Sequence, residues 1–181
     1  MNKTTLISAI AATLFTLSAQ AEKYYVEASL GNTSLETGSA SESDTSFSIL
    51  GGYDVYQQDK IKIAAEVGYN QYAELTSTDD FFGQQVTTTQ DISSLAFGAK
   101  LAYNPMPKVD VFGRLAYETI TNDVESDGFG SLSATSDEIT YAVGASYQVV
   151  DNFALGTQYK YASLDGGADL TNITVSANYH F

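Results

Sequence analysis

Apolar and polar side chains alternate along eight separate segments of this chain. A period of two places the two sets of side chains on opposite faces of a β-strand. In the last segment Ile173, Val175, Ala177, Tyr179 and Phe181 alternate with Thr174, Ser176, Asn178 and His180. The same pattern runs through residues 24–30, 46–55, 61–70, 94–103, 109–118, 139–149 and 153–162. The last strand ends on an aromatic residue without a polar tail, so we expect it to be paired and to lie against an apolar phase.

The two faces of these predicted strands differ in a way that indicates lipid on one side. One face is apolar or aromatic and carries no charge within the strand cores, where a charge facing the middle of a bilayer costs about 2–4 kcal/mol. The other face is rich in glycine, alanine and serine, which fit the crowded interior of a narrow barrel. Its exceptions are Tyr25, Leu50 and Phe112. A β-sandwich in water would carry charges on its outer face in most strands.

The connections between the strands alternate in length. Three connections are short, at residues 56–60, 104–108 and 151–152. Three others are long and polar: Ser34–Asp44, Thr76–Gln90 and Thr121–Ser136. The last connection, residues 165–169, lies on the same side as the long ones but is brief. Alternating lengths are typical of an up-and-down meander whose two ends face different compartments. The sequence therefore predicts an all-β fold, an eight-stranded antiparallel up-and-down transmembrane β-barrel. We expect the short turns and both termini in the periplasm, and mobile long loops outside the cell.

Aromatic residues concentrate near the ends of the predicted strands, on the apolar face. Those near the short turns are Tyr24, Tyr53, Tyr103, Tyr147, Phe153, Tyr179 and Phe181, and those near the long connections are Tyr69, Tyr117, Tyr141 and Tyr161. Two such levels are typical of the interfacial girdles of a membrane barrel.

The first residues have the features of an export signal. Lys3 precedes an apolar run at residues 6–17, and Ala19-Gln20-Ala21 fits a cleavage site. The run is shorter than the roughly 20 residues that cross a bilayer. We therefore predict a cleaved signal peptide at residues 1–21 and one barrel domain at residues 22–181. The chain has no cysteine, which excludes thiolate metal sites. Its 22 acidic residues against 8 basic ones make nucleic acid an unfavourable partner.

Three short pieces of the chain carry a family resemblance: residues 65–69 (AEVGY), 98–103 (GAKLAY) and 109–115 (VDVFGRL). With the pattern around them, they resemble the small eight-stranded outer-membrane barrels, the family that includes the transmembrane domain of outer membrane protein A. The resemblance implies residence in the outer membrane of a Gram-negative bacterium. It also implies contact with outer-membrane lipid and lipopolysaccharide, and insertion by the outer-membrane assembly machinery. In that family the terminal aromatic strand is the assembly signal, which corresponds here to Tyr179 and Phe181.

Charged residues on the inward face form a candidate site. They are Lys62 and a predicted lumen charge network of Glu27, Glu66, Lys100, Arg114, Glu118 and Lys160. An eight-stranded barrel is about wide enough inside for its own side chains, so these charges must pair with one another or with trapped water. The pairs then form either a structural plug or a gate that opens when partners switch. In the resembled barrel, residues that match Glu66 and Lys100 belong to such a network. That network also contains a second acid and an arginine, and this chain has Ser146 and Gly156 at the matching positions.

Other candidates are weaker. His180 is the only histidine and lacks a neighbouring serine and acid, so we predict no enzyme activity and no cofactor. The acids at residues 123–127 and Asp79-Asp80 match no complete calcium loop and are better explained as solvated surface, although divalent cations could bridge them to lipopolysaccharide phosphates. Phe81 and Phe82 in the second long connection are candidates for contact with a partner or the membrane surface.

Together these observations predict an integral outer-membrane protein, expected to be monomeric, with a structural and surface-interaction role. That role comprises membrane integrity and loop-mediated contact with an unknown extracellular ligand. The alternatives are a narrow gated porin for small solutes or ions and, less favoured, a lipid-modifying enzyme. A soluble exported barrel that binds an apolar ligand would instead turn Glu66, Lys100 and Arg114 towards water.

Overall fold

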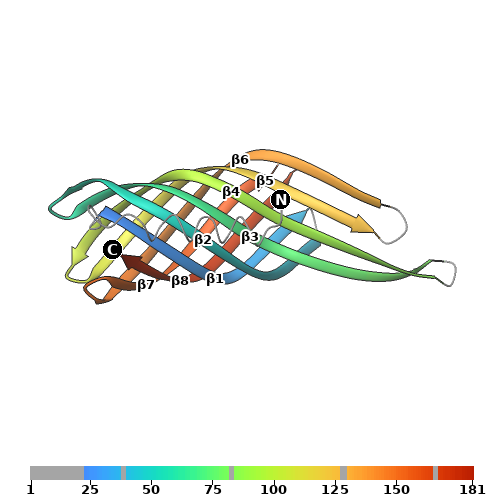
Figure 1. The fold of residues 1–181 in the computed structure, drawn as a ribbon, viewed down its shortest axis with the longest axis horizontal. Coiled ribbons are helices and arrows are strands. Elements are labelled where there is room, and N and C mark those ends of the chain that lie inside the picture. The colour runs from blue at the N-terminus through green and yellow to red at the C-terminus, as the bar shows by residue number, and fades with distance from the viewer. Residues whose placement is uncertain (1–22, 38–39, 82–83, 127–129, 165–166) are drawn as a thin grey trace.

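The computed structural model describes residues 23–37, 40–81, 84–126, 130–164 and 167–181 of the chain. These residues form eight strands in one closed antiparallel barrel (Figure 1). The strands are β1 (Tyr24–Thr37), β2 (Ala40–Gln58), β3 (Ile61–Phe81), β4 (Gln84–Met106), β5 (Val109–Ser126), β6 (Gly130–Val150), β7 (Phe153–Leu164) and β8 (Ala168–His180). Each strand pairs with the next, and β8 closes the ring on β1. The predicted up-and-down barrel is confirmed, and the predicted signal peptide lies outside the described residues.

The predicted short turns gather at one end of the barrel, where β8 also ends (Figure 1). They are tighter than expected: β2 and β3 are separated by Asp59 and Lys60, and β4 and β5 by Pro107 and Lys108. Asp59 and Lys108 adopt positive φ angles of 50° and 68°. We call this the short-turn end of the barrel.

At the other end the prediction of long irregular loops is wrong. β3 and β4 remain paired as far as Phe81 opposite Gln84, and β5 and β6 as far as Ser126 opposite Gly130. The threonines of the expected loops pair across strands instead, as at Thr76 opposite Thr89. Threonine favours strands and pairs well with threonine across a ladder. These ladders lack an apolar face, so alternation could not reveal them.

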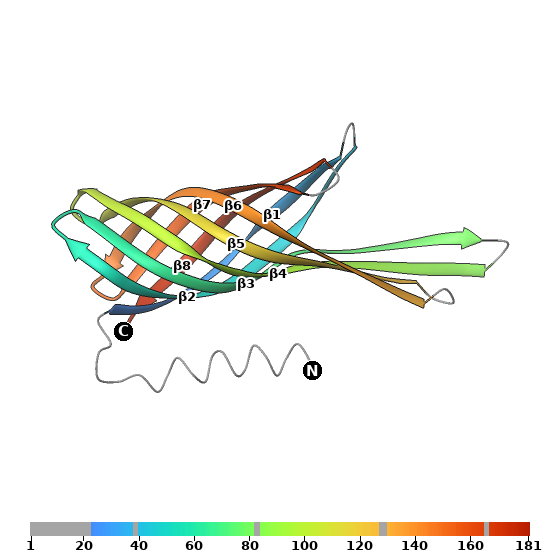
Figure 2. The same cartoon turned by 90° about the horizontal axis from the view of Figure 1, so that it is seen from above.

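The barrel wall divides into two groups of strands at this long-strand end (Figure 2). The last described pair between β2 and β3 is Phe47 with Gln71, and between β6 and β7 it is Tyr141 with Tyr161. Beyond those pairs, β3 to β6 continue as a four-stranded sheet that we call the protruding sheet. Its residues are 72–81, 84–92, 120–126 and 130–140.

The outer and inner faces of the barrel follow the predicted alternation. Outward apolar residues are exposed, among them Phe97 at 68% and Val175 at 66%, whereas inward Ser29 and Glu118 are buried. Tyrosines from both predicted levels are also exposed, such as Tyr147 at 53% and Tyr141 at 56%. Among the described residues, no helix is long and apolar enough to cross a membrane. The exposed belt of apolar side chains is the surface that a bilayer would cover.

Two large exceptions on the inward face are explained by glycines on the neighbouring strand. Tyr25 lies opposite Gly52, and a Cβ atom on that glycine would come within 2.1 Å of the tyrosine Cζ atom. Phe112 lies opposite Gly144, where a Cβ atom would come within 2.5 Å of the phenylalanine Cζ atom. Each ring therefore occupies the space that a side chain on its cross-strand partner would need. Aromatic–glycine pairs of this kind fix the register of a sheet.

Gly52→Ala is expected to destabilise the barrel, because the added methyl group overlaps the Tyr25 ring. Overpacking of this kind costs about 1–3 kcal/mol. The folded fraction against urea can be measured from the difference in migration between unboiled and boiled protein on a denaturing gel.

The matched control is Gly113→Ala, whose Cβ would meet nothing closer than the Ala142 carbonyl oxygen at 3.8 Å. This control should change the free energy of unfolding little. In a Tyr25→Ala background, Gly52→Ala should no longer be costly. An equal cost in both backgrounds would reject the packing explanation.

Candidate functional site

Arg114 is the centre of a buried ion network in the middle of the lumen. Its Nη1 and Nη2 atoms each lie 2.8 Å from a carboxylate oxygen of Glu27, a bidentate pair. Its Nε atom lies 3.0 Å from Glu66 Oε2, and Nη1 also donates to the Gln158 side-chain oxygen. Tyr25 donates its hydroxyl to the same Glu66 carboxylate. Paired forks between guanidinium and carboxylate are among the stronger hydrogen bonds in proteins. We call this set the Arg114 network.

A second buried network surrounds Glu118, whose exposed fraction is 0%. Lys160 Nζ lies 2.8 Å from Glu118 Oε1. The other donors to this carboxylate are Ser94, Thr140, Asn70 and Tyr72. A buried charge is tolerated when it is paired and fully hydrogen-bonded, as it is here. We call this set the Glu118 network.

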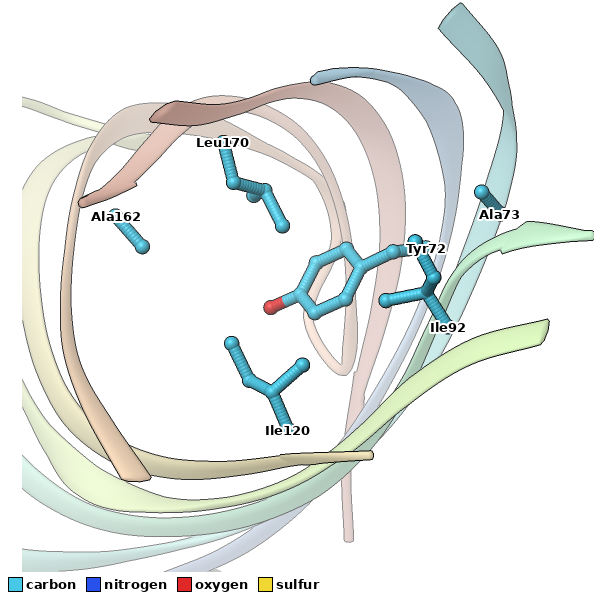
Figure 3. Packing of buried hydrophobic residues seen from close by; sticks show 6 residues of the cluster. All are labelled: Tyr72, Ala73, Ile92, Ile120, Ala162 and Leu170. Carbon is cyan, nitrogen blue, oxygen red and sulfur yellow. The ribbon is translucent and has the colours of Figure 1, made fainter. Parts of the chain in front are cut away.

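Tyr72 enters the Glu118 network through an irregularity in its strand. The β3–β4 register shifts between Gln71 and Ala73, so Tyr72 is an extra residue in β3. A β-bulge of this kind re-aims a side chain, and here it turns the tyrosine ring into the lumen (Figure 3). Lys160 Nζ also lies 3.1 Å from the Tyr72 hydroxyl. The alternation breaks at this bulge, which is why sequence reasoning missed this residue.

Lys100 lies beside the Arg114 network, against two aromatic rings. It forms no salt bridge with any residue in the described part of the chain, and Glu66 pairs with Arg114 instead. The Lys100 Nζ atom lies 4.5 Å from the ring centre of Phe112 and 5.3 Å from that of Tyr25. A cation over an aromatic face is stabilised by the ring quadrupole. The two inward aromatic exceptions in the sequence are therefore the neighbours of this lysine.

An apolar cluster covers the Glu118 network at the long-strand end. Figure 3 shows its members pointing into the lumen: Tyr72, Ala73, Ile92, Ile120, Ala162 and Leu170. Leu35 and Leu164 pack against it. The cavity lined by residues of both networks has a volume of only about 40 Å³. A cavity of this size has room for only a few water molecules.

The remaining predicted site residues lie at the ends of the strands. The His180 ring lies 5.0 Å from that of Tyr25, and within the described residues its imidazole forms no hydrogen bond with a serine. The Tyr179 and Phe181 rings meet edge to face at 5.3 Å, and the Phe181 amide donates to the Tyr24 carbonyl. Phe81 is the last residue of β3, but its side chain and the whole of Phe82 lie outside the described residues.

The protruding sheet has two edges, and they differ. On the β3 edge, Asp44 Oδ2 accepts a hydrogen bond of 2.8 Å from the Glu74 amide. On the other edge, residues 130–140 of β6 pair with β5 but with no other strand in the described chain. The protruding sheet is also acidic, because residues 71–99 and 115–159 contain no lysine or arginine. Among the described residues, no three histidine, cysteine, aspartate or glutamate residues are grouped so that they could hold a metal ion.

The sequence model of the outer membrane protein beta-barrel domain matches residues 7–181. The fold is similar to that of Ail, the attachment invasion locus protein of Yersinia pestis, solved with the heparin analogue sucrose octasulfate. The identity is 15%, 88% of this chain and 99% of that chain are covered, and the TM-score is 0.64. Neisserial surface protein A is similar at 16% identity over 87% of this chain and 97% of that chain, with a TM-score of 0.61. No curated protein matches the sequence.

Arg114→Ala is expected to lower the free energy of unfolding by about 3–5 kcal/mol, because it leaves Glu27 and Glu66 buried without their cation. The triple variant Glu27→Gln, Glu66→Gln, Arg114→Gln should recover much of that loss, since no buried charge of the trio remains. Urea titrations of the barrel in detergent, monitored by gel migration, measure both.

The control is Lys62→Ala, which removes a partly exposed salt bridge to Asp110 of 3.4 Å. Partly exposed pairs contribute under about 1 kcal/mol, so this variant should lose little stability. If Arg114→Ala were no more damaging than Lys62→Ala, the Arg114 network would not be a stabilising element.

Proposed function

The chain belongs to the outer membrane protein beta-barrel domain family, and from this premise we propose that it is a surface protein whose protruding sheet binds an extended segment of a basic extracellular polypeptide. It is an integral protein of the bacterial outer membrane. The proposed orientation places the protruding sheet outside the cell and the short turns in the periplasm. The barrel is proposed to act as a monomer, with Tyr179 and Phe181 as the signal for the assembly machinery.

The observation that carries this proposal is the edge of β6. Residues 130–137 present backbone donors and acceptors along one side that no described strand uses. Such an edge is a template for one more strand, and many recognition domains bind peptides by adding a strand to a sheet. Edges that must stay unpaired usually carry lysine, proline or a bulge. Residues 130–136 have none of these residues or other charges, and Leu132 is 72% exposed.

The charge of the protruding sheet supports a basic partner. Asp123 lies opposite Asp91, which lies opposite Glu74, so three acids share one row across β3, β4 and β5. Like charges directly opposite one another are destabilising, and a cationic partner would relieve that repulsion. Ail was solved with sucrose octasulfate, a polyanion. The acidic sheet of this chain supports the opposite preference.

A structural role for the lumen completes the proposal. The two buried networks and the apolar cluster fill the interior and support a plug that contributes to membrane integrity. The gated porin is the alternative, and it would need ions to pass both networks. We propose no enzyme activity, since no described residue offers a nucleophile to His180. Outer-membrane lipid and lipopolysaccharide are the proposed partners of the apolar belt and its rim.

Binding to the β6 edge can be measured by fluorescence anisotropy on the barrel in nanodiscs. The probe is a labelled peptide of alternating lysine and valine, and the comparison peptide has glutamate in place of lysine. The lysine peptide should bind and weaken as salt is raised, because screening reduces charge attraction. The glutamate peptide should not bind.

Adjacent proline variants test which edge is used. Successive residues of a strand turn their N–H groups to opposite sides, so either Ser133→Pro or Ala134→Pro removes a donor from the free edge and leaves the β5 ladder intact. That variant should bind the lysine peptide at least about tenfold more weakly. The matched pair on β3, Thr76→Pro and Ser77→Pro, should leave binding unchanged. Unaltered binding by both β6 variants would exclude this edge.

Single-channel recordings in planar bilayers separate the plug from the gate. Under the proposed plug, the protein carries no resolved current, and Lys100→Ala leaves it silent because the salt bridges of both networks remain. A gate predicts that Lys100→Ala or Glu66→Ala changes conductance. Unchanged conductance in both variants would therefore remove the gate as an explanation.

A further inference from the structure

The short-turn end of the barrel holds a cavity of about 260 Å³ that lies apart from the Arg114 and Glu118 networks. Its lining includes Asp54, Lys62, Asp110, Gln148 and His180. Sites for drug-sized ligands have volumes of about 300–1,000 Å³. This cavity is therefore large enough for a small ligand with a few waters. Neither the plug nor the protruding sheet uses it.

Asp54 is the unusual member of this lining. It is only 7% exposed, and its carboxylate forms no hydrogen bond or salt bridge with a residue in the described ranges. Asp110 provides the contrast, because its two oxygens accept from Lys62 at 3.4 Å and from Asn104 at 3.1 Å. The oxygens of Asp54 still reach the water of the cavity, since neither is a fully enclosed atom. The geometry thus presents a largely buried carboxylate to the cavity.

The net charge of the cavity lining is negative, which favours a cationic ligand. Three carboxylates, those of Asp54, Asp110 and Asp151, face one ammonium group, that of Lys62, which leaves an excess of two negative charges. A coordinated metal ion fits poorly, because the described residues contain no group of three acidic, histidine or cysteine ligands suited to one. The volume of the cavity leaves room for a short carbon chain beside an ammonium group.

We propose that the short-turn end binds a small organic ammonium ion, with the ammonium group on Asp54 and its carbon chain in the remaining volume of the cavity. The lysine–aspartate pair beside the site stays intact and limits the space to a short chain. In the proposed orientation this site opens to the periplasm. It is separate from peptide binding by the protruding sheet, so either proposal can fail without the other.

The test uses the full barrel in nanodiscs and propylammonium chloride as the probe. Side-chain amide signals of Gln148 and Asn152, both in the cavity lining, are followed by NMR as the probe is added. Saturable shifts are expected with propylammonium. Propan-1-ol, which has the same chain without the charge, and sodium chloride at equal ionic strength should produce no saturable shift. Equal responses to all three, or no saturation with propylammonium, would overturn the proposal.

Asp54→Asn keeps the side-chain shape and should weaken binding at least about tenfold. The matched control is Asp59→Asn, which removes the same charge from an exposed turn at the same end, outside the cavity lining. This control should bind propylammonium with an affinity within about twofold of that of the unmodified protein. Equal losses in both variants would mean that bulk charge, not this site, attracts the cation. If Asp54→Asn does not fold, the comparison of propylammonium with propan-1-ol on the unmodified protein still decides.

Discussion

Backbone N–H and C=O groups within a bilayer find no water to bond, so a sheet in that environment must close. The pairing of β8 with β1 is therefore the interaction on which the rest of this structure depends. Closure sends every second side chain into a lumen that eight strands leave only wide enough for those side chains. Charged residues that lipid excludes must meet there. The contact between Arg114 and Glu27, from strands that are not neighbours in the ring, is a direct consequence of closure.

The bilayer also decides how much of the fold the sequence could predict. Within the apolar belt one face of each strand must be apolar, so alternation located the strands, and β3, β5 and β7 begin at the predicted Ile61, Val109 and Phe153. Beyond the apolar belt both faces of a strand are in contact with water, so apolar and polar residues no longer alternate along it. The ladder that pairs Thr76 with Thr89 has the composition of a loop. Polar composition alone could not distinguish a solvated hairpin from an irregular connection.

The sequence could predict which charged residues lie in the lumen, but not which of them form ion pairs with one another. Alternation placed Glu66, Lys100 and Arg114 inside, because they share the inward face. Which of them meet depends on the stagger of the strands around the barrel, which the alternation does not determine. Contacts such as Arg114 with Glu27 join residues 87 positions apart. Tyr72 depended on a bulge, for which the chain offers only a break in the pattern. Tyr25 and Phe112 could be recognised in the sequence as large aromatic residues on a face of mostly small ones. That departure from the pattern was the available signal for their role beside Lys100.

The distribution of charge separates what holds the barrel together from what the barrel presents to its surroundings. In the middle of the lumen, Glu27 and Glu66 balance Arg114 and Lys100, and nearer the long-strand end Glu118 balances Lys160. Neither layer carries net charge, so the excess of acidic over basic residues belongs to the two ends. Charges there lie in water, where salt screens them over about 8–10 Å. An acid on the protruding sheet or at the short turns can therefore change with little effect on the buried networks. The same screening limits each end to ligands that come close, which favours contact with a strand edge or entry into a cavity over attraction from a distance.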